Sequence, residues 1–190
     1  MKSFLKIYCL VFCFGVFFYS CEETVEGCTD STACNYDPSA TEDDGSCCIP
    51  SDTVIEITSM ESPVYGQVGG DLESYAYIKN ASCNQAEIMV RKVTSFNPLD
   101  PSQASAYFCL AGECVDASVS VSTKSLSLEP CQEADYVTSD VDGDGVVDYF
   151  KGYFSADQPG AYEVKYRFFL EDDIETATEI TIAYILSDSE

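Results

Sequence analysis

Five residues late in the chain have the types and spacing of a calcium-binding loop. They are Asp140, Asp142, Asp144, Val146 and Asp148. Carboxylates at alternate positions can converge on one ion, the valine offers a backbone carbonyl, and the last aspartate binds directly or through water. Gly145 permits the sharp turn that such a loop needs. The segment 140–148 therefore predicts calcium as a cofactor.

The predicted loop departs from an EF-hand at its twelfth position, where a bidentate glutamate is usual. Lys151 stands there, so Asp135, Glu133 or water would have to complete the coordination shell. The pattern resembles the loops of thrombospondin type 3 repeats and dockerins, because the flanks read as strand rather than helix. We expect weak binding, on the order of 10⁻⁴–10⁻³ M; the alternative is a plain acidic turn.

A second set of oxygen ligands lies in the segment 27–50, and it forms a second candidate metal loop. Its members are Asp30, Asn35, Asp37, Asp43 and Asp44. Packed carboxylates repel one another unless a cation lies among them, and hard oxygen ligands suit calcium. The alternative is a solvated acidic loop. So short a segment cannot bury a core, so disulfides must hold it together.

The cysteines predict a disulfide framework. Of eleven, Cys9 and Cys13 lie in the predicted signal segment and Cys21 at its end. The remaining eight are Cys28, Cys34, Cys47, Cys48, Cys83, Cys109, Cys114 and Cys131. They fall into two groups of four, 28–48 and 83–131, and spacing alone does not fix the connectivity within them. Cys109 and Cys114 flank a glycine turn, which leaves Cys83 and Cys131 as partners if all are paired. Zinc is disfavoured because C-x-x-C pairs are absent.

The first twenty residues read as an export signal. Lys2 and Lys6 precede an apolar run from Ile7 to Tyr19, which is shorter than the roughly 20 residues of a membrane-spanning helix. The segment FYSC, which ends at Cys21, resembles the lipobox of bacterial lipoproteins. This resemblance implies a signal peptide at 1–20, lipidation of Cys21 and an acidic tether at 21–26. The alternative is an ordinary secretory signal.

Composition excludes several classes of function. The chain carries 33 acidic and 9 basic residues, with a formal charge of −24, so nucleic acid is not an expected partner. It has no histidine, which removes histidine-based catalysis and histidine-ligated metals. No carboxylate pair stands in an identifiable cleft, so we expect no enzyme activity.

Alternating apolar residues predict a β-sandwich over 53–187. In the segment AYEVKYRF the residues from Tyr162 to Phe168 place aromatic and aliphatic side chains on one face and charged ones on the other. The expected strands are 53–59, 72–79, 87–94, 106–109, 118–128, 146–155, 161–170 and 175–186. Short strands at this spacing favour an all-β fold, an immunoglobulin-like antiparallel sandwich.

Two segments resemble known surface modules. Residues 27–47 (GCTDSTACNYDPSATEDDGSC) are similar to a repeat of exported proteins from gliding, type IX-secreting Gram-negative bacteria. The segments FCLAGEC and GAYEVKYRFF resemble an immunoglobulin-like, non-catalytic accessory module of the same bacteria. The calcium loop would lie in an insertion at 131–148. The acidic residues after Cys21 resemble the surface-export signal of such lipoproteins.

Together these features predict a lipid-anchored protein exposed on the outer membrane. Its calcium-stabilised sandwich would serve adhesion or envelope structure, with an unidentified protein or glycan ligand. The alternative is an accessory glycan-binding lipoprotein, because thirteen tyrosines could supply faces for stacking sugars. Most of these tyrosines alternate along strands, so we expect them chiefly in the core or on a sheet surface.

Overall fold

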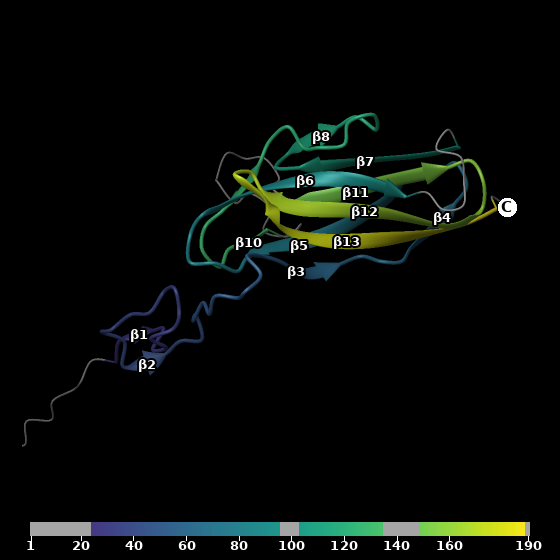
Figure 1. Ribbon diagram of the computed structural model, residues 1–190. Helices are drawn as coiled ribbons and strands as arrows, with labels where there is room; N and C mark the ends of the chain where they lie inside the picture. Colours follow the sequence, from purple (N-terminus) through teal and green to yellow (C-terminus); the bar gives the residue numbers. More distant parts are fainter. Residues whose placement is uncertain (1–23, 96–102, 135–148, 189–190) are drawn as a thin grey trace, which may run out of the picture.

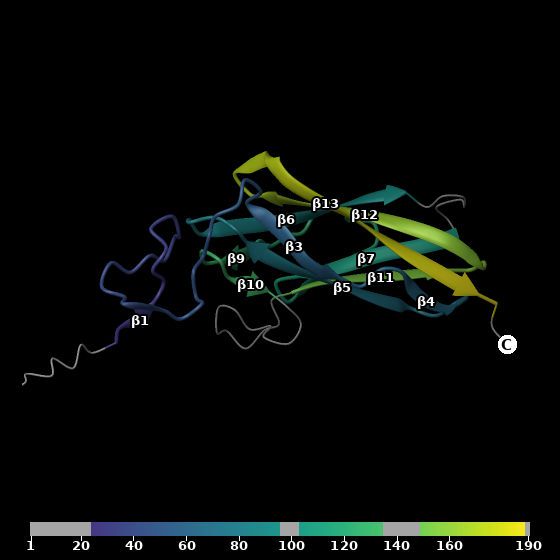
Figure 2. The ribbon, with the colours of Figure 1, turned by 90° about the horizontal axis from the view of Figure 1, so that it is seen from below.

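The computed structural model describes residues 24–95, 103–134 and 149–188. Within these residues no helix has the length and apolar character needed to cross a membrane. A small module at the N-terminal end contains a parallel pair, β1 (Glu26–Gly27) and β2 (Glu42–Asp43). The rest forms two facing sheets. Figure 1 looks onto the face of the sandwich, so that the two sheets overlap, and Figure 2 shows one sheet above the other.

Each sheet is named here for a central strand. The six-stranded β5 sheet contains β3 (Ile55–Met60), β5 (Leu72–Asn80), β10 (Glu133–Ala134), β11 (Phe150–Ala156), β7 (Ala104–Leu110) and β8 (Glu113–Val115). The five-stranded β12 sheet contains β4 (Val64–Gln67), β13 (Asp173–Ser187), β12 (Gly160–Leu170), β6 (Ala86–Ser95) and β9 (Leu126–Leu128).

The chain changes sheets between its first two sandwich strands. β3 pairs antiparallel with β5, whereas β4 pairs parallel with β13 on the opposite sheet. The other pairings within the two sheets are antiparallel. The predicted fold class, an immunoglobulin-like β-sandwich preceded by a disulfide-stapled module, is confirmed.

Aromatic side chains fill the space between the sheets. The inward positions of β12, which include Tyr162, Tyr166 and Phe168, are at most 1% exposed. Phe150 of β11 packs edge-to-face on Phe168, with 5.1 Å between the ring centroids. Offset and edge-on contacts of this kind favour ring pairs beyond their buried area. The period-two pattern of the sequence therefore identified the buried face of β12 correctly.

The expected strand at 118–128 is largely wrong. Only β9 and an isolated bridge at Val121 form there. Asp116 caps a turn by accepting hydrogen bonds from Ser118, and the Ser122 hydroxyl donates to the sulfur of Met89 and accepts from the Val90 amide. Serine and aspartate side chains compete with the sheet for backbone groups in this way. The short strands β4, β8 and β10 were not predicted.

The cysteines pair differently from the expected grouping. All eight are joined, as Cys28–Cys47, Cys34–Cys83, Cys48–Cys131 and Cys109–Cys114. The expected Cys83–Cys131 pair and the closed group at 28–48 are therefore wrong, and two bridges instead join module to sandwich. We call Cys34–Cys83 and Cys48–Cys131 the linking bridges.

Separation along the chain concealed this pairing. The turn between β5 and β6, which carries Cys83, and the segment before β10, which carries Cys131, lie at the same end of the sandwich as the module (Figure 1). Asn80 N donates to Gln132 O at 2.9 Å across these two segments. The described C-terminal end of β13 lies at the opposite end of the sandwich.

Candidate functional site

The principal predicted calcium loop lies outside the part of the chain that the structure describes. Asp140, Asp142, Asp144, Val146 and Asp148 all lie outside the described residues, as does Asp135. Of the flanking positions, Glu133 lies in β10 opposite Lys79 of β5. Lys151, at the twelfth position, lies in β11 and forms an ion pair with Glu73.

The second predicted loop is described, and its carboxylates cap separate turns. Asp30 accepts hydrogen bonds from the backbone and hydroxyl of Thr32, and Asp37 accepts the same pair from Ser39. The backbone bond from Thr32, followed by its hydroxyl bond, holds the pKa of Asp30 below its ordinary value. Turns of this type recur in loops rich in aspartate and serine.

The remaining members of this set also have local partners. Asp43 accepts from Gly45 N and Asp44 from Ser46 N, while Asn35 accepts from Cys48 N and donates to Ser46 O. Among the described residues, the one group of three or more metal-ligating side chains that the structure brings together is Cys34, Cys48 and Cys131. The structure therefore does not gather the five predicted oxygen ligands into one cluster.

The outer face of the β5 sheet carries tyrosines in two cross-strand rows. Strand register places Tyr107, Tyr153 and Glu73 in one row across β7, β11 and β5. The next row contains the Cys109–Cys114 bridge, Lys151 and Tyr75. Side chains at alternate positions of neighbouring strands meet on one face. We call these residues the tyrosine face.

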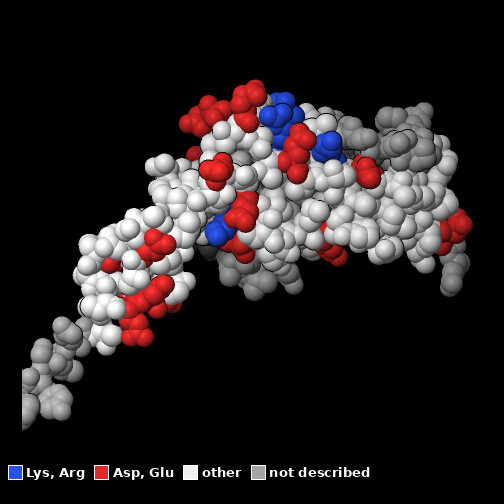
Figure 3. Space-filling view, turned by 60° about the horizontal axis from the view of Figure 1, so that its bottom comes forward, with Lys and Arg blue, Asp and Glu red and all other residues white. Residues whose placement is uncertain are grey.

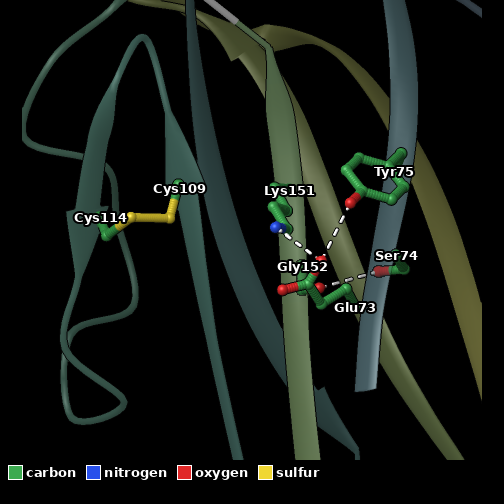
Figure 4. Close-up of polar contacts among 7 residues, drawn as sticks. All are labelled: Glu73, Ser74, Tyr75, Cys109, Cys114, Lys151 and Gly152. Atoms are coloured by element: carbon green, nitrogen blue, oxygen red, sulfur yellow. Dashed lines mark hydrogen bonds and ion pairs between the residues drawn. A yellow bond between two sulfur atoms is a disulfide. The ribbon is translucent and has the colours of Figure 1, made fainter. Parts of the chain in front are cut away.

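A charged group lies at the centre of the tyrosine face (Figure 4). Lys151 Nζ is 2.7 Å from Glu73 Oε2, and the Tyr75 hydroxyl donates to the same carboxylate oxygen at 3.0 Å. The ammonium lies 4.8 Å from the Tyr153 ring centroid. Burial opposes its charge, but the hydrogen bond to Glu73 holds the pKa of Lys151 above its ordinary value. This network joins side chains of β5 and β11 on the outer face of the sheet.

One tyrosine of this face borders a hollow. The Tyr107 and Tyr153 rings are stacked 4.4 Å apart with 6° between their planes. β7 lies between β11 and β8, so the other face of the Tyr107 ring is turned toward β8. There it lines a hollow of about 520 Å³ together with Cys114, Val115, Asp116 and Ala117. We call this the Tyr107 hollow.

The Tyr107 hollow combines an aromatic wall with a carboxylate. Hydrogen bonds from Ser118 hold the pKa of Asp116 below its ordinary value, so this side chain is an acceptor at neutral pH. Burial, followed by the charge of Asp71, raises the pKa of Tyr107, which keeps its hydroxyl protonated. Sequence reasoning did not single out this pair, because only the strand register brings Tyr107 beside the turn that follows β8.

Acidic residues are spread over both the module and the sandwich, and basic ones are few in the view of Figure 3. A second hollow of about 560 Å³ lies between β3 and β13, where Ile55, Ile57 and Met60 of β3 face Thr178 and Ile180 of β13. The Thr178 hydroxyl donates to Ile55 O across it. This contact joins the two sheets where their edges meet.

Comparison with known proteins gives similarity of structure alone. No protein-family model matches the chain, and no curated protein matches its sequence. The N-terminal domain of PorA is similar with a TM-score of 0.43 and 13% identity, over 70% of this chain and 96% of that domain. A CARDB domain from Pyrococcus furiosus, solved in complex with di-metal ions, is similar with a TM-score of 0.41 and 13% identity, over 74% of this chain and 99% of that domain.

A conjugative transposon lipoprotein from Bacteroides eggerthii is also similar, with a TM-score of 0.38 and 10% identity, over 68% of this chain and 93% of that one. Likeness at this level is too distant to transfer a ligand or an activity.

Proposed function

We propose that this chain is an exported, lipid-anchored protein of the outer-membrane surface with a non-catalytic role in adhesion or envelope structure. One observation carries the proposal: all eight cysteines of the described chain are in disulfides. Such a density of bridges suits an oxidising compartment and not the cytosol. The apolar segment that ends at Cys21 supplies the route of export.

Anchoring by lipid fits the charge of the chain. At −24 it is repelled by anionic lipid headgroups, so charge cannot hold it at a membrane. A lipid at Cys21 would hold the module nearest the bilayer, since the module follows directly in sequence. The linking bridges would then transmit that attachment to the sandwich.

Calcium at 140–148 is part of the proposal. The loop would be held between β10 and β11, which both pair with β5. An ion there would neutralise carboxylates in a strongly acidic chain and order the connection between the two strands.

The anchor is tested on the native protein in its own membrane. Mass spectrometry of the mature N-terminus should find an acylated Cys21, and a protease added to whole cells should remove the protein. A Cys21→Ser variant should be released to the soluble fraction. A mature N-terminus before or after Cys21, or an unacylated Cys21, would contradict lipidation. Resistance of the protein to protease added to whole cells would contradict surface exposure.

A second candidate function is recognition of a neutral glycan, and the Tyr107 hollow favours it. A tyrosine ring can stack on the apolar face of a sugar ring, and a carboxylate accepts hydrogen bonds from hydroxyls. Asp116 lies at the hollow beside Tyr107. The acidic surface would repel sulfated or uronic-acid polymers, so the ligand would be uncharged.

A glycan array probed with the mature protein tests this candidate. Tyr107→Ala should reduce binding at least tenfold, and Asp116→Asn, which retains a turn-capping side chain, should reduce it less. Tyr65→Ala is the matched control, because Tyr65 is 72% exposed on β4 of the other sheet. Equal binding by Tyr107→Ala and Tyr65→Ala would sink the glycan function while leaving the surface role intact.

A further inference from the structure

Four cysteines meet where the module joins the sandwich. The Sγ atoms of Cys34, Cys48 and Cys131 lie within 4.8 Å of one another, and Cys83 is bonded to the first of them. We propose that the linking bridges exchange partners, giving Cys34–Cys48 within the module and Cys83–Cys131 within the sandwich. After the exchange no disulfide would join the module to the sandwich, and the main chain would be their one covalent connection.

The module already holds its own pair side by side. Cys34 N donates to Cys48 O at 2.8 Å, and Cys48 N donates to Asn35 Oδ1 at 2.8 Å. Both hydrogen bonds lie entirely within the module. Formation of Cys34–Cys48 therefore needs local movement of side chains and no refolding of the module.

In the sandwich, hydrogen bonds join the segments that carry Cys83 and Cys131. Asn80 is fully buried, and its Nδ2 donates to Asn84 O, Leu128 O and Glu129 O. These bonds fasten the turn that carries Cys83 to the segment that leads to Cys131. Asn80 N adds a bond to Gln132 O at 2.9 Å. Hydrogen bonds thus join the two segments of each alternative pair, so we expect both pairs of segments to keep their places during the exchange.

Exposure determines where the exchange begins. Cys83 is exposed, Cys34 and Cys131 are half-buried, and Cys48 is 6% exposed. A thiolate from solvent, either a small thiol or a thiol–disulfide oxidoreductase, reaches the sulfur of Cys83 first. Disulfide exchange rates depend strongly on such access.

The exchange balances without an oxidant or a reductant. The external thiolate attacks Cys83 Sγ, which breaks the Cys34–Cys83 bond, forms a mixed disulfide and releases Cys34 as a thiolate. That thiolate attacks Cys48 Sγ, forming Cys34–Cys48 and releasing Cys131. The Cys131 thiolate attacks Cys83 Sγ and expels the external thiolate. Two disulfides are present before and after, and the external thiol is regenerated.

The sharpest test removes the need for an external thiol. A Cys83→Ser variant leaves Cys34 free beside Cys48–Cys131, so exchange should transfer the free thiol to Cys131. Alkylation followed by peptide mapping without reduction should find the label on Cys131 together with a Cys34–Cys48 peptide. A label confined to Cys34 would overturn the proposal.

Two further variants keep the test interpretable. Cys131→Ser should yield Cys34–Cys48 with the free thiol on Cys83, which checks the exchange from the opposite side. Cys114→Ser is the matched control, in which the free thiol should remain on Cys109 and both linking bridges should persist. Each variant is compared with wild type by circular dichroism, so that misfolding is recognised.

The wild-type chain gives the physiological version of the experiment. Incubation of the mature protein with glutathione at mildly alkaline pH should produce Cys34–Cys48 and Cys83–Cys131 peptides, with Cys28–Cys47 and Cys109–Cys114 unchanged. Protease cleavage within 49–53 should accelerate in step with their appearance. Unchanged pairing, while a thiol-specific probe shows that Cys83 has formed the mixed disulfide, would contradict the exchange.

Discussion

At the scale of single residues, hydroxyl groups enclosed by aromatic rings shape the middle of the core. Ser74 Oγ lies 2.8 Å from the Tyr184 hydroxyl and donates to Gly152 O at 3.3 Å. Position 152 admits only glycine, because a Cβ there would lie 2.7 Å from Ser74 Oγ and 3.1 Å from the Tyr166 hydroxyl. The packing of the Ser74 and Tyr166 hydroxyls against β11 therefore depends on the missing side chain at position 152.

The two buried tyrosines should respond differently to loss of their hydroxyls. Tyr184→Phe removes the bond to Ser74, so we expect a loss of about 1 kcal/mol in the free energy of unfolding. Among the described residues, the buried Tyr166 hydroxyl meets no partner with hydrogen-bond geometry, although the Tyr184 hydroxyl lies nearby. Tyr166→Phe should therefore leave stability equal or raise it by about 1 kcal/mol. Urea denaturation of both variants measures the two changes in the free energy of unfolding. Equal losses of stability would contradict the different hydrogen bonding of the two hydroxyls.

The same side chain predicts a loss of stability in alkali. Burial raises the pKa of Tyr184 to about 12, whereas a tyrosine in the unfolded chain has a pKa of about 10. Above that pH the unfolded chain releases its proton first, so the native state loses stability as pH rises. Each unit of difference between the folded-state and unfolded-state pKa is equivalent to about 1.4 kcal/mol in the free energy of unfolding. Urea midpoints between pH 9 and about 12 should fall, and fall less steeply in Tyr184→Phe; identical slopes would refute the explanation.

At the scale of elements, the sequence identified long strands better than the pairing between strands. β5, β6, β12 and β13 alternate strongly, because each has one face in the core, and their predicted ranges agree with the structure to within a few residues. β4 has four residues and β10 has two. Neither is long enough to produce a pattern, since partners in space define them.

Register explains why the Tyr107 hollow escaped prediction. The spacing of tyrosines along β7 and β11 places each on the outer face, but only the pairing of Tyr153 with Tyr107 stacks the two rings. A shift of one residue would turn one of them inward. Sequence alone thus predicted the presence of surface tyrosines and not their arrangement.

A charged residue occupies an inward position of β6. Lys92 is 6% exposed, and its Nζ donates to Ala106 O at 2.5 Å and to Ala117 O at 2.7 Å. These bonds join β6 to β7 and to the segment after β8. Burial, against the opposing charge of Asp116, lowers the pKa of Lys92.

Lys92→Met tests the contribution of this side chain. The substitution retains most of the apolar volume but leaves two carbonyls without their donor, so we expect a loss of about 1–3 kcal/mol. Lys165→Met, on the outer face of β12, should change stability by less than about 0.5 kcal/mol. Chemical denaturation compares the two, and similar values would mean that the ammonium of Lys92 adds nothing to stability.

At the scale of the whole molecule, covalent links and charge act together. The module is too small for a core of its own, and two of its four bridged cysteines pair with the sandwich. The even count of cysteines predicted a fully oxidised chain, but pairing followed proximity in the fold rather than in the sequence. The oxidation of these eight cysteines could therefore be inferred from their number, whereas the attachment of module to sandwich could not.

Net charge makes the response to divalent ions the most informative property of the intact molecule. A chain at −24 gains stability from any screening cation, so calcium must be compared with magnesium at equal ionic strength. At ten times its dissociation constant, one bound calcium adds about 1.4 kcal/mol, which raises the melting temperature by about 3–6 °C for a domain of this size. Asp142→Ala should abolish the excess over magnesium, whereas Asp30→Asn should preserve it, because Asp30 caps a local turn. Equal melting temperatures in calcium, magnesium and EDTA would argue against a specific ion at 140–148.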